Sequence, residues 1–463
     1  RNVPLRVYTS IPSCVPATSP KFETTGGNID VEDVREALQW DRTVALGEVM
    51  DYPSVLRGEE EIHAMIRETL GSGKVVEGHA PDLSEEELNA YIGTGVSSCH
   101  ESTRKEEGLE KLRLGMCLMI REGFASIKNL SELIRVVTEE NVDTSRICLV
   151  TDDRHPEDII NEGHMDHVVR RAIEEGVDPI EAIQMSTINT ATHFKVDQVV
   201  GGIAPGRFAD MVILEDLDMI SVSEVIADGR IVASNGEFIG KFGSYKYPED
   251  AKRSVKLSRK LDRHDFTVQA EQKRDTAKVR VMGVDESSPI TENLTEELPI
   301  DDGSLQTSVD RDLAKVAVVE RHKKTGNIGL GFVTGFGFEE GATATTIAHD
   351  SHNLLIVGMD EGDMAVAANK LAEVGGGVVT VREGEILRFL KLPIGGLMSD
   401  QPLERTREKM SKLSKSWDEL GCKMDFPFPT IVLLALPVLP KLRITDKGLV
   451  DTVSFEKIDL LID

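Results

Sequence analysis

Residues 75–79 read Val-Val-Glu-Gly-His, and residues 95–100 read Gly-Val-Ser-Ser-Cys-His. In both stretches a short run of small or β-branched residues closes on a histidine, and a helical pattern follows. The stretch after the first one contains Ser84-Glu-Glu-Glu87, which resembles a capping box that opens a helix. Strands that alternate with helices are typical of a parallel α/β fold. The two stretches therefore predict βα units that carry polar chemistry at the carboxyl ends of their strands.

Four further runs of this kind occur within the first 195 residues, so six strands are predicted there. They span residues 6–14, 44–50, 117–121 and 147–151. The polar side chains at the six strand ends are Ser13, Cys14, Glu48, His79, His100, Glu101, Arg121, Glu122, Asp152 and Asp153. In a (β/α)8 barrel the carboxyl ends of the strands form the rim of the active site. One polar residue there is often only a cap, but a pattern shared by six strands favours a partial (β/α)8 barrel over residues 1–195.

Three more segments are predicted after the barrel. Residues 196–245 form a small β-sandwich segment with short strands, in which Asn235-Gly236 is a hairpin-type turn. Residues 246–312 form a charged connector, and we expect its part at 287–303 to be an exposed loop. Residues 313–463 form a C-terminal α/β or α+β domain. The fold class of the whole chain is therefore α/β.

The charge balance of the chain excludes several classes of partner. Its 463 residues include 53 Lys and Arg against 80 Asp and Glu, which gives a net charge of −27. Such a surface repels nucleic-acid phosphates and anionic lipid, and the densest basic run, residues 321–324, is too short to offset this. No apolar run reaches the ~18 residues of a membrane span. We expect a protein that binds neither nucleic acid nor membrane.

The cysteines indicate the compartment. Five cysteines lie far apart in the sequence, and their number is odd. This usage fits a reducing cytosol better than a disulfide framework. We therefore expect a cytoplasmic protein.

The familiar short motifs of nucleotide-binding loops, dinucleotide-binding turns, HExxH metalloproteases and GxSxG hydrolases are absent.

Four of the strand-end residues have the chemistry of metal ligands: Glu48, His79, His100 and Asp152. Neutral imidazoles and carboxylates suit Fe, Mn or Zn. A carboxylate such as Glu48 can bridge two divalent ions, and Asp152 can ligate one ion and accept a proton from its water, whose pKa the ion lowers to about 7. A lone histidine is more often a hydrogen-bonded core residue. Two histidines, a glutamate and an aspartate at four different strand ends favour a metal site instead.

Motifs spread over nearly the whole chain resemble the adenine deaminase family of the amidohydrolase superfamily, as found in bacteria and archaea. In the first part of the chain they are residues 13–18 (SCVPAT), 47–50 (GEVM), 78–81 (GHAP), 100–102 (HES), 110–116 (EKLRLGM), 121–123 (REG), 151–156 (TDDRHP), 187–191 (TINTA) and 203–210 (IAPGRFAD). In the C-terminal domain they are residues 348–353 (AHDSHN) and 392–400 (LPIGGLMSD).

The resemblance implies hydrolysis of adenine to hypoxanthine and ammonia at a site with two divalent metal ions, Mn or Fe, with Zn as an alternative. It implies that Glu48 bridges the ions and that His79 and His100 hold the second one. Asp152 would ligate the first ion and shuttle a proton, so that Asp152 and Glu48 are the expected catalytic residues. We also expect the protein to form a homo-oligomer.

Four further residues are candidates for contact with the substrate. Arg121 and Glu122 stand where charge on the substrate or transition state could be met, and a structural ion pair is the alternative for them. For His349 and His352 the two readings are a loop that contacts the substrate and a hydrogen-bonded turn inside the C-terminal domain.

The sequence also departs from the family pattern. The family's His-x-His pair at the first barrel strand has no counterpart here, and the chain starts with Arg1 near the expected third strand. We therefore expect an N-terminally truncated enzyme that contains barrel strands 3 to 8. Cys99 stands where the family commonly has an acidic residue. Two alternatives to adenine deamination stay open: an inactive fragment that lacks the first metal-binding His pair, and another cyclic amidine or amide hydrolase of the same superfamily.

Overall fold

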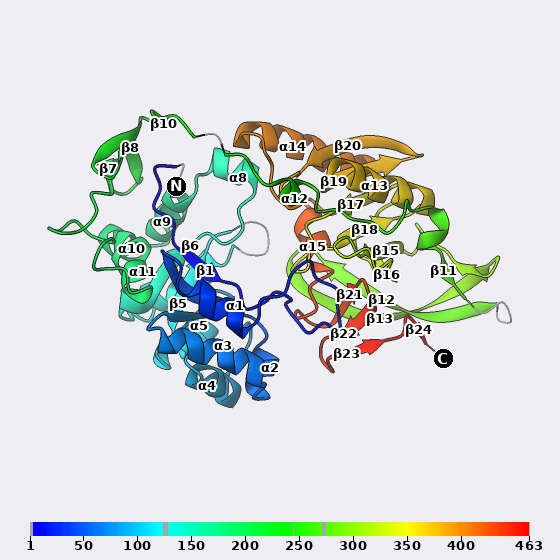
Figure 1. Cartoon of the computed structure of the whole chain (residues 1–463), viewed down its shortest axis with the longest axis horizontal. Coiled ribbons are helices and arrows are strands. Elements are labelled where there is room, and N and C mark those ends of the chain that lie inside the picture. Colours follow the sequence, from blue (N-terminus) through cyan, green and yellow to red (C-terminus); the bar gives the residue numbers. More distant parts are fainter. Residues whose placement is uncertain (1–2, 124–127, 244, 271–274, 463) are drawn as a thin grey trace. The chain divides into compact units, whose positions relative to one another are not determined.

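The computed structural model describes all residues except 1–2, 124–127, 244, 271–274 and 463 (Figure 1). The chain forms two compact units. The first unit contains residues 1–14 and 29–246, and the second contains residues 15–28 and 247–463. The prediction of a barrel over residues 1–195 is wrong for residues 15–28, which belong to the second unit. Their backbone is held there, since Thr24 N donates to Asp446 Oδ1 over 2.8 Å.

Among the described residues, the part of the first unit predicted as a barrel contains six parallel strands, and each of them overlaps a predicted run. They are β1 (Thr9–Ile11), β2 (Thr43–Val49), β3 (Val75–Gly78), β4 (Ser98–Cys99), β5 (Cys117–Arg121) and β6 (Ile147–Val150). Strands β1, β2 and β3 form one parallel sheet, and β4, β5 and β6 form another. The boundary between the two sheets falls between β3 and β4, which matters for the site described below.

Short helices follow these strands, as the predicted βα pattern requires. They are α1 (Val31–Ala37), α2 (Tyr52–Leu56), α3 (Glu60–Gly71), α4 (Glu85–Gly93), α5 (Lys105–Arg113), α6 (Leu130–Leu133), α7 (Arg135–Thr138), η2 (Thr144–Arg146), α8 (Pro156–Asn161), α9 (Met165–Glu174), α10 (Pro179–Ser186) and α11 (Ile188–His193). Their starts are encoded locally: Asp30 caps α1 with a full capping box, and Asp178 caps α10 just before Pro179.

The strands present different residues to their two faces. Leu118 and Ile120 of β5 pack with Leu133 and Val168 from the helices, whereas Cys117 and Met119 lie in a separate small cluster. Side chains alternate across a strand. Arg121 therefore shares its face with Cys117 and Met119, away from the helices.

Residues predicted as a β-sandwich segment form one antiparallel sheet. Its strands, in spatial order, are β10 (Glu237–Phe238), β9 (Arg230–Ser234), β8 (Ser221–Ala227) and β7 (Met211–Asp216). The predicted turn joins β9 to β10, where both Asn235 and Gly236 have positive φ angles of 51° and 79°. Two positive φ angles are the requirement of a type I′ hairpin turn, which explains the Asn-Gly pair.

The second unit is built on an eleven-stranded sheet. Ten of its strands follow the spatial order β11 (Val268–Gln269), β14 (Ser304–Leu305), β13 (Ser288–Asp301), β12 (Thr276–Asp285), β16 (Ile328–Thr334), β15 (Ala314–Val319), β18 (Leu354–Gly358), β17 (Ala342–Thr345), β19 (Gly377–Arg382) and β20 (Glu385–Lys391), and β24 (Leu461–Ile462) pairs with β12. A small antiparallel sheet contains β21 (Leu442–Thr445), β22 (Gly448–Asp451) and β23 (Glu456–Ile458).

Helices pack on both faces of the large sheet. The helical segments of this unit are α12 (Glu249–Lys252), η3 (Arg263–Phe266), α13 (Glu361–Val374), α14 (Leu403–Glu419) and α15 (Phe428–Leu433). On β15, Ala317 packs in the core cluster that contains α13, and Val318 packs in the one that contains Trp417 of α14. Successive side chains of β15 thus point into two different hydrophobic cores, one on each face of the sheet. The unit therefore has three layers, with the sheet between two layers of helices.

The expectation of a charged connector over 246–312 is wrong for much of its length. Residues 287–303, predicted as an exposed loop, are mostly strand β13, which pairs with β12 over a long antiparallel ladder. Only Thr291 and Leu298 of β13 are buried. Most of the strand's side chains face solvent, so it lacks the alternation of apolar residues by which a strand is recognised from sequence.

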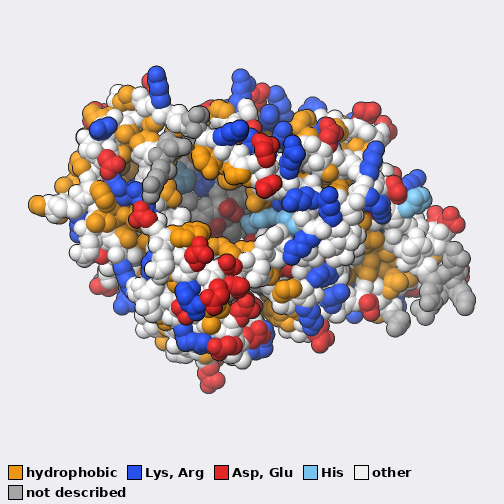
Figure 2. Space-filling model, in the orientation of Figure 1, with side chains coloured by type: hydrophobic (Ala, Val, Ile, Leu, Met, Phe, Trp, Pro, Cys, Tyr) orange, Lys and Arg blue, Asp and Glu red, His pale blue; other side chains and the backbone are white. Residues whose placement is uncertain are grey.

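The acidic composition appears directly on the surface. Figure 2 shows Asp and Glu side chains gathered over the N-terminal helices of the first unit. Exposed members of this group include Glu32, Asp33, Glu60 and Glu61. No helix among the described residues is long and apolar enough to cross a membrane.

Candidate metal centre

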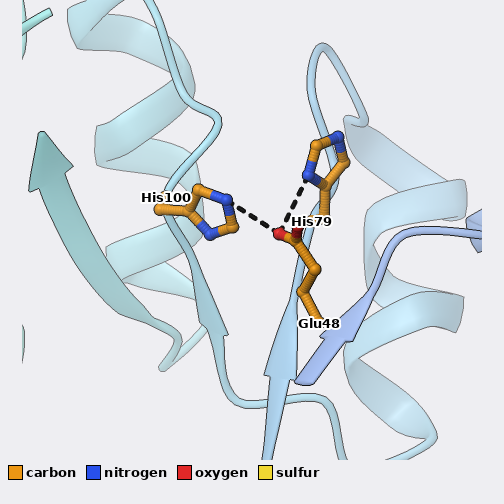
Figure 3. A group of neighbouring side chains, drawn as sticks. All are labelled: Glu48, His79 and His100. Atoms are coloured by element: carbon orange, nitrogen blue, oxygen red, sulfur yellow. Dashed lines mark hydrogen bonds and ion pairs between the residues drawn. The ribbon is translucent and has the colours of Figure 1, made fainter. Parts of the chain in front are cut away.

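Three side chains from the ends of three successive strands meet in the first unit (Figure 3). Glu48 lies near the end of β2, His79 follows β3, and His100 follows β4. Glu48 Oε2 lies 3.0 Å from His79 Nδ1 and 2.8 Å from His100 Nε2. One ligand atom from each of the three residues falls within 4.8 Å of the other two. This is the spacing at which three side chains can share one ion.

A second group shares His100 with the first. The ligand atoms of His100, Glu101 and Asp152 also lie within 4.8 Å of one another. Arg121, at the end of β5, donates to Asp152 Oδ2 over 2.8 Å and to Glu101 Oε1. The two groups together form a continuous polar cluster, to which β2, β3, β4, β5 and β6 each contribute a side chain at or just beyond the strand end. We call Glu48, His79, His100, Glu101, Arg121 and Asp152 the strand-end cluster.

The charges within the cluster are complementary. Burial alone would raise the pKa of Glu48, but the neighbouring His100 and His79 outweigh it and hold that pKa well below its usual range. Burial alone would lower the pKa of His100, but the Glu48 carboxylate outweighs it and raises that pKa to about 10. Two carboxylates, Glu48 and Glu101, thus stabilise positive charge at this position.

The donor set suits a divalent cation. Imidazole and carboxylate ligands are those of Mn, Fe and Zn sites. His79 Nε2 is buried and has no hydrogen-bond partner among the described residues. In Figure 3 this nitrogen points away from Glu48, whereas His79 Nδ1 faces Glu48 Oε2 over 3.0 Å. Nδ1 is therefore the nitrogen of His79 that could bind an ion shared with Glu48 and His100, and the donor set of the three residues fits such an ion.

The structure thus brings together Glu48, His79, His100 and Asp152, the four residues predicted as metal ligands. Their ligand roles stay a prediction. Glu101 was noted at a strand end in the sequence but was not selected as a candidate, and its position next to His100 could have indicated it.

The two candidate substrate-binding residues of the first unit behave differently. Arg121 belongs to the strand-end cluster. Glu122 does not, since its Oε2 accepts from Leu130 N over 3.4 Å and its Oε1 lies 3.9 Å from Arg171 Nε. These contacts favour the alternative of a structural ion pair for Glu122. The reason is the alternation of the strand, which turns successive residues to opposite sides.

His349 and His352 lie in the second unit, in a hydrogen-bonded turn. His352 N donates to Ala348 O over 2.7 Å, and Ala348 N donates back to His352 Nδ1 over 3.1 Å. Within the same turn, Ser351 Oγ donates to Glu23 Oε2 over 2.6 Å, and Asn353 Nδ2 donates to Thr24 O over 2.7 Å. These contacts fit the reading of a turn inside the domain, and a substrate role for either histidine stays a prediction.

The turn makes a pH dependence testable. Burial, followed by the charges of His349 and Arg321, lowers the pKa of His352 to about 3. An unfolded histidine has a pKa near 6.5, so the unfolded state binds more protons and the stability of the second unit falls as the pH drops from about 6.5 towards 3. Between pH 7 and pH 5 we expect this residue to cost about 2 kcal/mol of unfolding free energy.

The measurement is urea unfolding at both pH values, followed by the fluorescence of Trp417 in a Trp40→Phe background. The His352→Gln variant should lose about 2 kcal/mol less than its parent between pH 7 and pH 5. Equal losses in the two proteins would contradict the assignment of a neutral, half-buried His352.

The comparisons with known proteins cover both units. A model of the amidohydrolase family matches residues 1–232, and a model of the adenine deaminase C-terminal domain matches residues 288–456. An adenine deaminase of Moorella thermoacetica is 49% identical over 462 residues, which make up 100% of this chain and 77% of that protein. The chain belongs to the adenine deaminase family. Adenine deaminases of Clostridium botulinum and Methanococcoides burtonii are 44% and 43% identical over 100% and 98% of this chain, and over 77% and 76% of their own length.

Membership of the adenine deaminase family confirms the resemblance stated from sequence motifs. It also confirms the α/β fold class of the amidohydrolases, to which the six parallel strands of the first unit belong. The family implies the use of divalent metal, and the strand-end cluster is the place in the described structure that offers suitable ligands.

Proposed function

We propose that the protein hydrolyses adenine to hypoxanthine and ammonia, with water as the second substrate. The observation that carries this proposal is the strand-end cluster within a chain that is 49% identical, over its full length, to a protein named adenine deaminase. The cluster supplies the chemistry, and the relatives supply the substrate.

The residues present fit one divalent ion at Glu48, His79 and His100, and Asp152 offers a ligand for a second. Glu48 would bridge them, His79 and His100 would hold one, and Asp152 would hold the other. We propose Mn or Fe as the metal, with Zn as the alternative, because all three accept imidazole and carboxylate ligands. When bound, such ions lower the pKa of a coordinated water to about 7 and so provide a nucleophile at neutral pH.

The side chains of the cluster perform the proton transfers. Asp152 is the acceptor of the proton that the attacking water loses, and it returns a proton to the amino group that leaves C6 as ammonia. Its carboxylate is oriented by two contacts: Arg121 Nη1 donates to Oδ2 over 2.8 Å, and Asp153 N donates to Oδ1 over 2.6 Å. Water adds at C6, and one proton returns to the departing nitrogen, so the reaction balances as adenine plus water to hypoxanthine plus ammonia.

Arg121 has a second part in this arrangement. Its guanidinium Nη1 donates to both Asp152 and Glu101, and its Nε donates to Asn129 Oδ1 over 2.8 Å. Three partners fix the guanidinium in one plane. We propose that Arg121 orients the Asp152 carboxylate for proton transfer, rather than contacting adenine directly.

Two alternatives are distinguished by separate measurements. Another cyclic amidine or amide could be the substrate, because fold and metal ligands do not determine the substrate in this superfamily. A protein without activity would bind no metal at the strand-end cluster. The cytoplasmic location and the homo-oligomeric state stay predictions.

The test is turnover by the complete gene product loaded with Mn²⁺ or Fe²⁺. We expect adenine to disappear with equal amounts of hypoxanthine and ammonia formed, measured by chromatography and by a coupled ammonia assay. Adenosine, guanine, cytosine and hydantoin serve as comparison substrates. Release of ammonia from one of these, or ring opening of hydantoin, without any reaction of adenine would overturn the substrate, and the absence of bound metal would overturn the site.

A further inference from the structure

We propose that Lys111 is a positioning residue that sets the distance between His79 and His100, and with it the affinity of the cluster for metal. This inference rests on the metal site of the proposed function. Lys111 lies on α5, outside the strand-end cluster, and touches none of the cluster's side chains in the contacts described below.

The ammonium of Lys111 is wholly buried, with a side-chain exposure of 0%. Its Nζ lies 2.7 Å from Glu107 Oε1, 2.8 Å from Ala80 O, 2.9 Å from Ser102 Oγ and 3.3 Å from Cys99 Sγ. An ammonium has three protons to donate. All of them are therefore engaged by this shell of four acceptors.

Three of these four acceptors lie close to the predicted metal ligands in the sequence. Ala80 directly follows His79, while Cys99 directly precedes His100 and Ser102 comes two residues after it. One ammonium thus binds the backbone beyond one predicted ligand and side chains on both sides of the other. Glu107, from the same helix, supplies the counter-charge.

Lys111 connects the two segments where, among the described residues, no strand ladder joins β3 to β4. In the part of the chain that the structure describes, β3 and β4 belong to different sheets, with no strand ladder between them. Ser97 N donates to Val76 O over 2.9 Å, and Ser98 Oγ donates to Glu77 Oε2 over 2.9 Å and accepts from Gly78 N over 3.3 Å. Past the strand ends, the Cys99 thiol lies 3.9 Å from Ala80 O, and Lys111 adds the shorter, charged contacts between the two segments that carry His79 and His100.

A buried side chain also connects β2 to β3, the strands at whose ends Glu48 and His79 lie. Tyr91 on α4 is buried, its hydroxyl donates to Val49 O, and His79 N donates to that hydroxyl over 3.1 Å. Val49 directly follows Glu48. Tyr91 therefore connects β2 to β3 as Lys111 connects β3 to β4, and each of these side chains comes from the helix that follows the later strand.

Stability alone does not explain a buried lysine. Moving an ammonium and a carboxylate out of water costs several kcal/mol per ion, and replacing such a pair by apolar residues is often neutral or stabilising. The pair does more for geometry than for stability, because an ammonium can hold three separate chain segments at fixed distances. Residues that orient metal ligands typically contribute 10- to 100-fold to metal affinity.

The test compares Mn²⁺ binding in two double variants. Lys111→Met alone leaves the buried Glu107 carboxylate without its counter-charge, so it is combined with Glu107→Gln. We expect the dissociation constant for Mn²⁺ to rise roughly 10- to 100-fold in this double variant. The measurement is a competition titration against a chelating dye, with circular dichroism and thermal unfolding recorded on the same samples.

The matched control is Lys315→Met combined with Glu361→Gln. Lys315 is 1% exposed, pairs with Glu361, and lies in the second unit. Removing this pair changes stability in the same way but should leave the Mn²⁺ dissociation constant unchanged. A purely structural Lys111 would behave like this control.

The outcomes separate the two proposals. If the unaltered protein binds Mn²⁺ and the Lys111 double variant binds it with the same affinity, the positioning role is overturned and the proposed function stands. If the unaltered protein binds no divalent ion, the proposed function itself fails. Should the double variant not fold, Ser102→Ala removes a single contact of the ammonium, and we expect roughly tenfold weaker Mn²⁺ binding; an unchanged affinity there would also overturn the inference.

Discussion

Replacing Asp152 by Asn is expected to lower the turnover number for adenine by about a thousandfold or more while the fold is retained. An amide of the same shape keeps an oxygen for Arg121 but cannot accept a proton. General acid–base catalysis typically contributes 10²- to 10⁴-fold, and Asp152 takes part in two proton transfers of the proposed reaction. The measurement is kcat for adenine, with circular dichroism as the check on folding.

The matched control for this change is Asp30→Asn. Asp30 caps α1 in the same unit, and Asn is an equally good N-cap residue, so neither stability nor turnover should change appreciably. Turnover close to normal in the Asp152 variant would refute the proton-shuttle role.

Replacing Glu48 by Gln is expected to remove most of the bound metal. The neutral amide offers one oxygen instead of two and no charge, while His79 Nδ1 and His100 Nε2 both lie within 3.0 Å of a single oxygen of Glu48. Loss of a bridging carboxylate affects both ions, so we expect bound metal to fall below one ion per chain and kcat to fall by about a hundredfold or more.

Elemental analysis of the dialysed protein measures this effect directly. The control is Glu36→Gln, the same chemical change at an exposed position on α1. Undiminished metal content in the Glu48 variant would remove this residue from the bridging position, whatever its effect on turnover.

Much of the first unit could be predicted from local sequence. The run at 117–121 coincides with β5, and each of the other five predicted runs overlaps a strand. Most of the strand-end cluster could also be predicted from sequence, because the carboxyl ends of parallel strands meet at one edge of a sheet and bring the polar residues there together. Glu48, His79, His100 and Asp152 were found by that rule alone.

Other features depend on information that the sequence carries only weakly. Arg121 and Glu122 are neighbours with similar expectations, yet one joins the cluster and the other contacts α6 and α9. A shift of one residue in a strand exchanges its two faces, and the sequence does not determine that register at a strand end. Strand β13 was missed because its buried positions are few, so the pairing with β12 rather than an apolar pattern defines it.

Lys111 shows a further limit of pattern reading. A lysine within a charged helix usually indicates a solvated face, and its helix, α5, contains five charged side chains besides Lys111: Lys105, Glu106, Glu107, Glu110 and Arg113. Its burial follows from the packing of α5 against the segments after β3 and β4. Lys111 lies in the family motif at residues 110–116, but the motif does not indicate its contacts.

The division between β3 and β4 has a consequence for the dynamics of the first unit. His79 leaves one sheet and His100 leaves the other, so an ion held by both histidines fastens two sheets that otherwise share few backbone hydrogen bonds. If metal binds only when His79 and His100 lie close together, it stabilises that arrangement by RT ln(1 + [M]/Kd), where [M] is the free metal concentration and Kd its dissociation constant. This amounts to about 2.7 kcal/mol when the metal concentration is a hundred times Kd. We therefore expect amide hydrogen exchange in Val75–Gly78 and Ser98–Cys99 to become slower when metal is added and faster under chelation. The proposed cofactor would then hold the two sheets together in addition to its proposed part in the chemistry.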